Sequence, residues 1–477
     1  MNIIPAKADI LSILPALILS GGGLILLVLQ FFSKSEERRL PRYFTGLILT
    51  IALWKTLDSG FGYPGFGRYF RDQITFTTVS SWLNLLYVIT ALLTVIASPR
   101  ILKQHNVNFP EFYPLLLFAT TGMFFMTSAS DLILMFVGLE TLSIALYVMI
   151  GMARNEMSCL EASLKYFLLG AFTSGFMLMG IAFLYGGSGS TLMITAFQPI
   201  IDGTATTYSK IGLGLLLVGV AFKIALVPFH SWTPDVYEGA LTTMTGFMAS
   251  APKAAAMGLM LIIFQYLFPV IQNTSWNILI GGLAFLSMTF GNILALKQDN
   301  LKRVLAYSSI SHAGYVVAGI ACGANLEVVY YLVIYAFTNI AAFSIIAYLE
   351  NGKNIITYSS LRYLVKTKPW SAIGLVALFF SLGGIPPLGG FWTKLFLFQK
   401  IAESDSPLNR FLLITGVINS AIAIFYYLRL TVNAFMTEET GEVVEESIPA
   451  SWGLSFTSIL GILIVSLSWI IFQPSSL

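Results

Sequence analysis

Charged residues are scarce in this chain of 477 residues. Lysine, arginine, aspartate and glutamate together make up 10% of it, whereas a soluble globular protein carries about 25%. Hydrophobic residues account for 56%, and the mean hydropathy is +0.80. A composition so poor in charge excludes a soluble globular fold. It predicts an all-α polytopic membrane protein surrounded by lipid bilayer.

Residues that bind metals and redox cofactors are also scarce. The two cysteines, Cys159 and Cys322, lie far apart and outside any CxxC spacing. This excludes an iron–sulfur or structural zinc site and argues against a disulfide scaffold. The three histidines, His105, His230 and His312, are too few and too scattered for bis-histidine haem ligation. We therefore expect no cofactor and no metal in this chain, and no nucleic-acid partner.

Long apolar runs define the expected spans. The run from Ile10 to Phe32 is longer than the apolar core of a signal peptide, and Lys7 and Asp9 make a poor basic leader. We therefore interpret this run as the first span. A span needs roughly 20 apolar residues, which predicts about 14 spans: 9–31, 42–54, 78–98, 110–128, 130–152, 161–186, 210–230, 243–268, 275–297, 301–320, 326–349, 371–401, 408–434 and 453–472.

Loop charges predict the orientation. The odd-numbered loops hold about 15 lysines and arginines, with Lys302 and Arg303 counted among them at the start of a span, and the termini and even-numbered loops hold about seven. Because positive loops stay in the cytoplasm, both termini are predicted to lie on the other side of the membrane.

Five glutamates between 438 and 446 form an acidic cytoplasmic loop. This loop is either simply solvated or a docking site for a partner subunit.

Four lysines, Lys165, Lys223, Lys253 and Lys394, lie inside predicted spans, and Glu140 is the one comparably deep acid. A charge near the bilayer centre costs several kcal/mol or more and needs a partner, water access or neutralisation. The pKa of lysine falls readily on burial, which lets it exchange protons near neutral pH. Four ammonium groups with one carboxylate cannot all stay charged at low dielectric. We expect at least one neutral lysine, and a Glu140–Lys223 coupling through which conformation sets proton affinity.

Structural interpretations compete with each of these functional ones. Glu140 could pin two helices through a neutral hydrogen bond, and Lys394 could only satisfy carbonyls at a helix break. Lys165 lies near a cytoplasmic end and could snorkel to the surface. His230 and His312 are candidate relay bases or structural groups. Tyr307, with the serines near it, could carry protons or only pack helices.

Two distant segments match without gaps, which indicates an internal repeat. Residues 140–151 align with 308–319, Ala171-Phe172-Thr173 aligns with Ala336-Phe337-Thr338, and Tyr166 falls opposite Tyr331. Each repeat contains five helices, an odd number, so the second copy enters the membrane from the opposite side. The predicted organisation is four parts: helices 1–3 in 1–105, the first repeat in 106–270, the inverted repeat in 271–436, and the acidic loop with helix 14 in 437–477.

Each repeat also contains a helix broken by proline. Leu226-Val227-Pro228 interrupts the first, and Gly383-Gly384-Ile385-Pro386-Pro387 interrupts the second. Proline frees a backbone carbonyl, and at membrane depth such groups are tolerated only inside protein or beside water. Inverted repeats with matching broken helices are a recurring transporter plan that binds ions near the midplane. We therefore expect hydrated cavities beside Lys223 and Lys394.

The motifs around these breaks resemble a known family. The runs Lys223-Ile-Ala-Leu-Val-Pro-Phe-His230 and Ala249-Ser-Ala-Pro-Lys253, together with 306–315 and 384–394, resemble the proton-conducting antiporter-like subunits of respiratory complex I. The similarity is greatest to subunit N (subunit 2) of NADH:quinone oxidoreductase and covers essentially the whole chain. One departure lies at 241–245, where this chain reads Leu-Thr-Thr-Met-Thr and the family usually has prolines.

The resemblance implies roles for individual residues. Glu140 matches the glutamate of helix 5, Lys223 its lysine partner on helix 7, and Lys253 the central lysine of helix 8. Lys394 matches the exit-side lysine of helix 12, which favours subunit N over subunit M, where that position is a glutamate. Subunit L carries a lateral helix that this chain lacks.

The function implied is that of a proton-translocating membrane-arm subunit. Partners would include the M, L, K, J and A subunits, in the plasma (inner) membrane of a bacterium. FMN, iron–sulfur clusters and quinone would belong to other subunits, and no redox chemistry to this chain. Two alternatives remain: a subunit of a multi-subunit Na⁺/H⁺ antiporter of the same fold, and a structural spacer whose lysines only hold the bundle.

Overall fold

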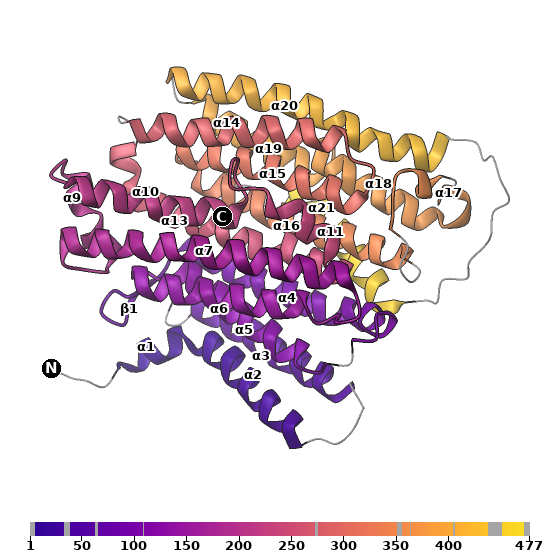
Figure 1. Cartoon of the computed structure of the whole chain (residues 1–477), viewed down its shortest axis with the longest axis horizontal. Coiled ribbons are helices and arrows are strands. Elements are labelled where there is room, and N and C mark those ends of the chain that lie inside the picture. Colours follow the sequence, from indigo (N-terminus) through magenta and orange to yellow (C-terminus); the bar gives the residue numbers. More distant parts are fainter. Residues whose placement is uncertain are drawn as a thin grey trace.

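A computed structural model describes residues 5–32, 39–62, 65–107, 109–271, 275–350, 355–362, 364–403, 406–436 and 451–471. Nearly all of this is helix, and the helices lie side by side in one bundle (Figure 1). The five glutamates of the acidic loop lie outside the described residues. The all-α polytopic fold expected from composition is therefore confirmed.

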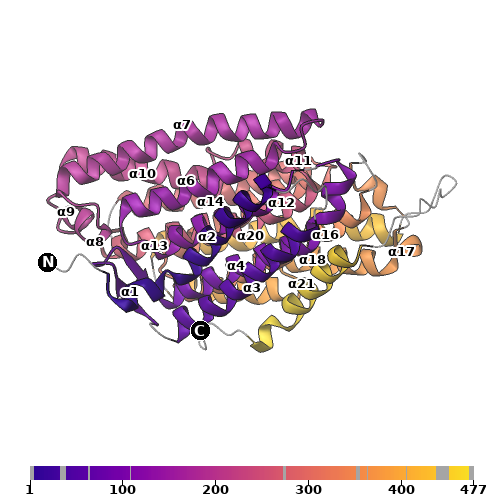
Figure 2. The same ribbon diagram turned by 90° about the horizontal axis from the view of Figure 1, so that it is seen from below.

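The first part of the chain builds one side of the bundle. A two-stranded hairpin, β1 (Gly67–Tyr69) and β2 (Ile74–Phe76), links its third and fourth helices at one end. In Figure 2, α7 lies along one edge of the bundle and α21 along the opposite one. The helices of this part are α1 (Lys7–Ser12), α2 (Leu14–Phe32), α3 (Arg39–Phe61), α4 (Thr78–Gln104), α5 (Phe112–Ser128), α6 (Leu132–Ile150), α7 (Met157–Ser188), α8 (Met193–Ala196) and α9 (Gln198–Ile201).

The rest of the chain holds the broken helices and the second half. It comprises α10 (Thr207–Ile224), α11 (Trp232–Gly239), α12 (Thr242–Ala249), α13 (Ala251–Ile271), α14 (Ser275–Leu296), α15 (Leu301–Ala321), α16 (Asn325–Leu349), η1 (Ser359–Leu361), α17 (Leu364–Thr367), α18 (Pro369–Gly383), α19 (Gly389–Ala402), α20 (Pro407–Thr431), η2 (Val432–Met436) and α21 (Trp452–Ile471).

The number of membrane helices agrees with the sequence. Within the described ranges, nine helices are long and apolar enough to cross a bilayer, with α12 and α13 taken as one, and four shorter helices are apolar throughout. With α3, a helix of 23 residues that carries Arg42, Lys55 and Asp58, these helices match the 14 spans expected. The helix expected over 42–54 is longer in the structure, where it covers Arg39–Phe61.

The helix expected over 243–268 is interrupted, a break that the sequence interpretation missed. α12 ends at Ala249, and Ser250 adopts φ −100° and ψ −94°, outside the helical region. Proline two residues later disfavours the α conformation of its neighbour and lacks a backbone donor. The Ser250 hydroxyl donates to the carbonyl of Gly246 (2.8 Å) and satisfies part of the broken turn. Lys253 therefore lies in the first turn of α13, directly after a break.

The two repeats run in opposite directions. The end of α5 lies beside the β-hairpin, because Ser130 N donates to the carbonyl of Gln73 (2.8 Å). Near the end of α13, the Tyr266 hydroxyl donates to Ser130 Oγ (3.3 Å). The first helix of the first repeat thus ends on the face where α14, the first helix of the second repeat, begins. This is the inversion expected from five-helix repeats.

Glycines allow the closest helix contacts. A Cβ on Gly122 of α5 would lie 2.5 Å from the Gly138 carbonyl oxygen and 2.6 Å from Leu142 N. A Cβ on Gly138 of α6 would in turn lie 2.8 Å from the Gly122 carbonyl oxygen. Small residues at such contacts let backbones approach where the bilayer supplies no hydrophobic force between helices. This pair holds α6, the helix of Glu140, against α5.

We expect Gly122→Ala to destabilise the protein by about 1–3 kcal/mol, the usual cost of overpacking a close contact. The thermal denaturation midpoint of the detergent-solubilised complex measures this. Gly175→Ala on α7 is the matched control, because a Cβ there meets nothing within 4 Å. Equal midpoints for the two variants would contradict the packing argument.

Candidate functional site

Glu140 lies at the margin of the bundle. Its carboxylate is half-buried on α6 and accepts a hydrogen bond from the Ser174 hydroxyl of α7 (Oγ to Oε1, 2.5 Å). Val137 and Ile144, one turn on either side, are 51% and 56% exposed. Among the described residues, no ion pair within 4.0 Å joins this carboxylate to a lysine. The direct Glu140–Lys223 pair implied by the resemblance is therefore absent from this conformation.

Lys223 reaches the same helix by another route. It lies in the last turn of α10, where Ala225 (φ +65°) ends the helix. Its Nζ donates to Ser143 Oγ (2.7 Å) and Tyr147 Oη (3.2 Å), which lie one and two turns after Glu140 on α6. Residues i, i+3 and i+7 share a helix face. α6 therefore presents the carboxylate and both partners of the lysine on one side.

Lys253 is a buried amine, 4% exposed, with one hydroxyl partner. Its Nζ donates to Ser309 Oγ on α15 (2.5 Å) and lies 5.9 Å from the centre of the Tyr237 ring. A cavity of about 20 Å³ is lined by Lys223 and Lys253 together, with Ser143, Tyr166 and Tyr237 among its other walls. A polar cavity needs roughly 10–15 Å³ to hold a water. The cavity between the two lysines is therefore large enough for one water.

His312 occupies the centre of the second half, held by two tyrosines. Its Nδ1 lies 2.5 Å from Tyr331 Oη and its Nε2 lies 3.2 Å from Tyr427 Oη. Tyr427 Oη also lies 2.5 Å from Ser308 Oγ. A second cavity, of about 10 Å³, is lined by His312, Tyr331, Ser381 and Leu382. The imidazole thus has a hydroxyl at each nitrogen and the α18 terminus across a small void.

Lys394 lies at the second broken helix. Its Nζ donates to the carbonyls of Leu382 (3.0 Å) and Gly383 (3.1 Å), which end α18. Terminal carbonyls have no partner within their own helix, and they favour a cation. Gly384, with φ +82°, turns the chain there, and a Cβ on it would lie 3.0 Å from Lys394 Cδ. Glycine is thus required both for the turn and for the lysine stem.

The lysines at the two breaks share one neighbour, a tyrosine ring. Lys223 Nζ lies 5.6 Å from the ring centre of Tyr147, and Lys394 Nζ lies 5.1 Å from that of Tyr315. Tyr147 and Tyr315 are matching positions in the sequence repeat. One lysine precedes its break and the other follows it, yet both reach the matching tyrosine.

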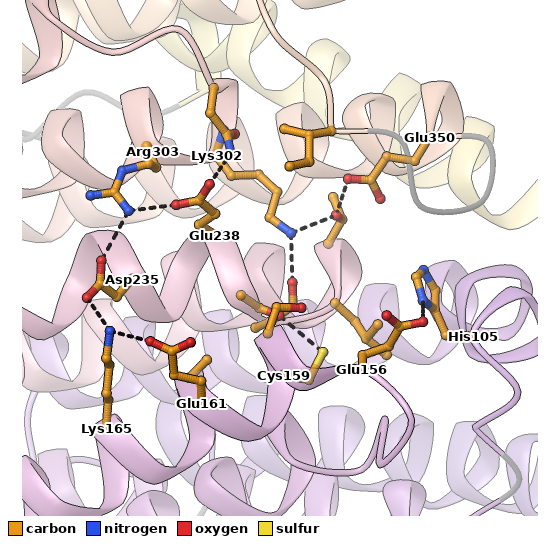
Figure 3. Close-up of a pocket in the computed structure, with 18 residues that line it drawn as sticks. His105, Glu156, Cys159, Glu161, Lys165, Asp235, Glu238, Lys302, Arg303 and Glu350 are labelled. Carbon is orange, nitrogen blue, oxygen red and sulfur yellow. Dashed lines mark hydrogen bonds and ion pairs between the residues drawn. The ribbon is translucent and has the colours of Figure 1, made fainter.

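Lys165 differs from the other three lysines, because it is not deep. Its side chain is 42% exposed and pairs with Glu161 (2.7 Å) and Asp235 (2.9 Å), as Figure 3 shows. Arg303, expected in a loop, also pairs with Asp235 (3.1 Å). Burial raises the pKa of the Asp235 carboxyl, but the hydrogen bonds from Lys165 and Arg303 outweigh burial and hold it below its usual range. Lys165 thus belongs to a surface network of charged groups.

His230 and Tyr307 lie apart from the lysine series. His230 follows Lys223 by seven residues, which would place both on one face of an unbroken helix. However, α10 ends at Ile224, and the helical register is lost before His230. Its Nδ1 is buried and has no hydrogen-bond partner among the described residues. Tyr307 is half-buried and packs against the hydrophobic core. The structure brings together Lys223, Lys253, His312 and Lys394, with Glu140 at one edge.

Several members of the network were missed from the sequence. Tyr427 comes from α20, and nothing in its spacing relates it to His312 on α15. Ser309 precedes His312 by one turn, so helical spacing from that histidine could have indicated it. Lys302 was counted among loop cations, whereas its amine is directed into a pocket between helices (Figure 3).

Known proteins resemble this chain along its whole length. Residues 129–423 match the family described as NADH:quinone oxidoreductase/Mrp antiporter, TM. NADH-quinone oxidoreductase subunit N of Leptospira interrogans is 52% identical over 99% of this chain and 93% of its own. Subunit N of Leptospira biflexa is 51% identical over the full length of both.

Solved structures give the same relationship. Respiratory complex I from Thermus thermophilus contains a chain 31% identical to this one, with a TM-score of 0.79 and coverage of 96% and 98%. The Mrp complex of a Dietzia species matches with a TM-score of 0.81 at 17% identity, covering 98% and 95%. At that identity the Mrp match shows the shared fold alone.

The hydroxyl partner of Lys253 offers a direct test. Ser309→Ala leaves the buried amine without its hydroxyl acceptor, which we expect to destabilise the protein by about 1–3 kcal/mol. Thermal denaturation of the solubilised complex measures the change. Ser311→Ala is the matched control on the same helix, because that hydroxyl is buried without a partner among the described residues. Equal effects would contradict a specific Lys253–Ser309 bond.

Proposed function

Because the chain belongs to the subunit N family of NADH:quinone oxidoreductase, we propose that it conducts protons across the membrane through a Glu140–Lys223–Lys253–Lys394 series. It is an antiporter-like membrane-arm subunit of this bacterial enzyme complex. The observation that carries the proposal is the connection between buried amines. Lys223 and Lys253 share one cavity, and Lys253 binds the helix that carries His312. Quinone reduction in other subunits would supply the driving force.

The series begins at Glu140. Its carboxylate acts on Lys223 through the shared face of α6, on which Ser143 and Tyr147 hold the amine. A change that brings the carboxylate toward the amine stabilises the ammonium form, and a change that removes it favours release of the proton. Ser174 holds Glu140 toward α7 in the present conformation. The bond to Ser174 and a pair with Lys223 are therefore the two states of the proposed switch.

The proton then passes from Lys223 to Lys253. The ammonium of Lys223 would donate a proton to a water held in the 20 Å³ cavity, and that water would pass one of its own to the neutral amine of Lys253. No heavy-atom bond changes. Both amines are buried among neutral hydroxyls and aromatic rings, so two neighbouring ammonium groups are costly at low dielectric. Arrival of one proton favours departure of the other.

The second half continues through His312. Ser309, which accepts from Lys253, lies one helical turn before His312 on α15. Tyr427 touches both Ser308 and the Nε2 of His312, and Tyr331 touches Nδ1. An imidazole with a hydroxyl at each nitrogen can accept a proton on one side and release it on the other. Beyond it lies the cavity that reaches Leu382, an acceptor of Lys394.

We also propose the partners, the location of the cofactors and the orientation that the sequence led us to expect. Membrane-arm partners would be the M, L, K, J and A subunits, and FMN, iron–sulfur clusters and quinone would be held elsewhere in the complex. Both termini would lie on the non-cytoplasmic side of the bacterial inner membrane.

The sodium/proton antiporter alternative is not favoured, because relatives 51–52% identical over nearly the full chain are named subunit N. Co-purification with iron–sulfur subunits separates the two.

Removing either charge at the start of the series tests the proposal. We expect Lys223→Ala and Glu140→Ala to lower the number of protons pumped per electron while the complex still assembles. Reconstituted vesicles with a pH-sensitive dye, followed during NADH oxidation, measure this ratio. If both variants pump normally, the proposal fails. If assembly falls while the ratio stays normal, the lysines are structural.

Tyr427→Phe tests the relay through His312. Loss of the hydroxyl should slow proton passage by about 10²-fold, the lower range for a positioned acid–base group. Tyr330→Phe is the matched control: it removes a buried hydroxyl bonded to Ser468 (3.4 Å), which is not in the series. Proton uptake by vesicles under an imposed gradient compares them. Equal rates in the two variants would exclude Tyr427 from the path.

A further inference from the structure

A larger pocket opens where α7, α11, α12 and α15 meet, beside the end of α16 (Figure 3). Its volume is about 410 Å³, enough for on the order of ten waters at about 30 Å³ each. The lining includes Lys165, Lys302 and Arg303 together with five carboxylates. This excess of acid favours cations over anions. Within the part of the chain that is described, no group of three or more His, Cys, Asp or Glu is placed to hold a metal ion.

The three cations of the pocket are not equivalent. Lys165 and Arg303 pair directly with carboxylates, and Asp235 bridges them. Lys302 forms no such pair within 4.0 Å in the described structure. Its Nζ donates to the carbonyl of Ala240 (2.7 Å) and to Thr242 Oγ1 (3.3 Å), both neutral groups. Lys302 is thus the one lining cation of the three that is free to give up its proton without breaking a direct ion pair.

The neighbours of Lys302 form an ordered series. Thr242 Oγ1, on a residue 1% exposed, donates to Glu350 Oε1 (2.6 Å) on a residue 7% exposed. An amine, a hydroxyl and a carboxyl therefore follow one another at the base of the pocket. When the ammonium passes a proton to Thr242, the hydroxyl releases its own proton to Glu350. The amine and the acid are then both neutral, and the reverse transfer restores them.

Helix α15 joins this base to the buried lysines. Lys302 lies in its first turn, and Ser309, the partner of Lys253, lies seven residues later. Seven residues place both side chains on one face, about 10.5 Å apart along the axis. Ala240, the other partner of Lys302, follows α11, which carries Tyr237 beside Lys253. The base of the pocket therefore lies two helical turns from the hydroxyl partner of Lys253.

We propose that Lys302, Thr242 and Glu350 form a proton-loading site that supplies Lys253 from the water of this pocket. The pocket lies at the aqueous face where α7 begins, which loop charges predict to be cytoplasmic. Glu238 and Cys159 are the other titratable groups nearest the amine. The inference rests on the proposed function of the lysine series, because a loading site needs a path to feed.

Chemical restoration of the amine tests the site in the intact complex. In a chain with Cys159 and Cys322 replaced by alanine, we expect Lys302→Cys to lower pumping per electron to the level of Lys253→Ala. Treatment with 2-aminoethyl methanethiosulfonate converts the thiol to a mixed disulfide, releases methanesulfinate and places an ammonium at the position. Pumping should return. Unchanged pumping before treatment, or no return after complete labelling, overturns the proposal.

Glu161→Cys in the same background is the matched control. Glu161 lines the pocket but contacts Lys165 on its own helix, four residues away. Labelling there adds an ammonium at the rim, and pumping should stay constant before and after it. Equal recovery from labelling at both positions would show that added charge, rather than the base of the pocket, restores pumping, and would overturn the site.

A second variant covers the case in which Lys302→Cys does not assemble. Thr242→Val keeps the side-chain shape and removes only the hydroxyl between Lys302 and Glu350, so pumping should fall while quinone reduction continues. Normal pumping in Thr242→Val overturns the loading site. Normal pumping in both Lys223→Ala and Lys253→Ala instead overturns the proposed function itself. The two failures are therefore distinguishable.

Discussion

The cost of burying an amine in a membrane governs the arrangement of this protein. An ion taken out of water loses several kcal/mol of solvation, so each deep lysine requires polar partners that replace water. Lys223 and Lys253 have hydroxyls, and Lys394 has the carbonyls left open where α18 ends. None of these partners is a carboxylate, so each amine can lose its proton without leaving a buried anion behind. Neutral partners suit a proton carrier better than a fixed ion pair.

Broken helices supply those partners, and α15 connects them. Where α10, α12 and α18 end, backbone groups and loop turns bring polar atoms to membrane depth, which is tolerated only inside protein. α15 runs between the two halves with nearly its whole length buried. It carries Lys302 in its first turn, Ser309 two turns later, and then His312 and Tyr315 at one-turn spacing. The helix that lines the charged pocket thus also carries the hydroxyl partner of Lys253 and the tyrosine ring beside Lys394.

Much of the charged site was predictable because the membrane makes charge conspicuous. Lys223, Lys253 and Lys394 stand out in apolar runs, and the structure finds all three in the interior. Lys165 was expected near a cytoplasmic end, where it could snorkel, and the structure places it in the surface network of Glu161 and Asp235. The break at Ser250 was missed, because Pro252 in the first turn of a new helix resembles a proline within one long helix.

The sequence by itself determined the all-α membrane fold, the inverted repeat and the deep lysines, since hydropathy and repeat spacing are local properties of the chain. Tertiary structure alone decided which groups meet. His312 lies between Tyr331 and Tyr427 from two other helices, and Lys302 leaves the loop environment expected for it to join Thr242 and Glu350. Residues with hydroxyl groups are uncharged and common in apolar helices, so the sequence does not mark the ones that contact a buried lysine or histidine. Only the packing of helices distant in sequence shows which of them hold a proton path.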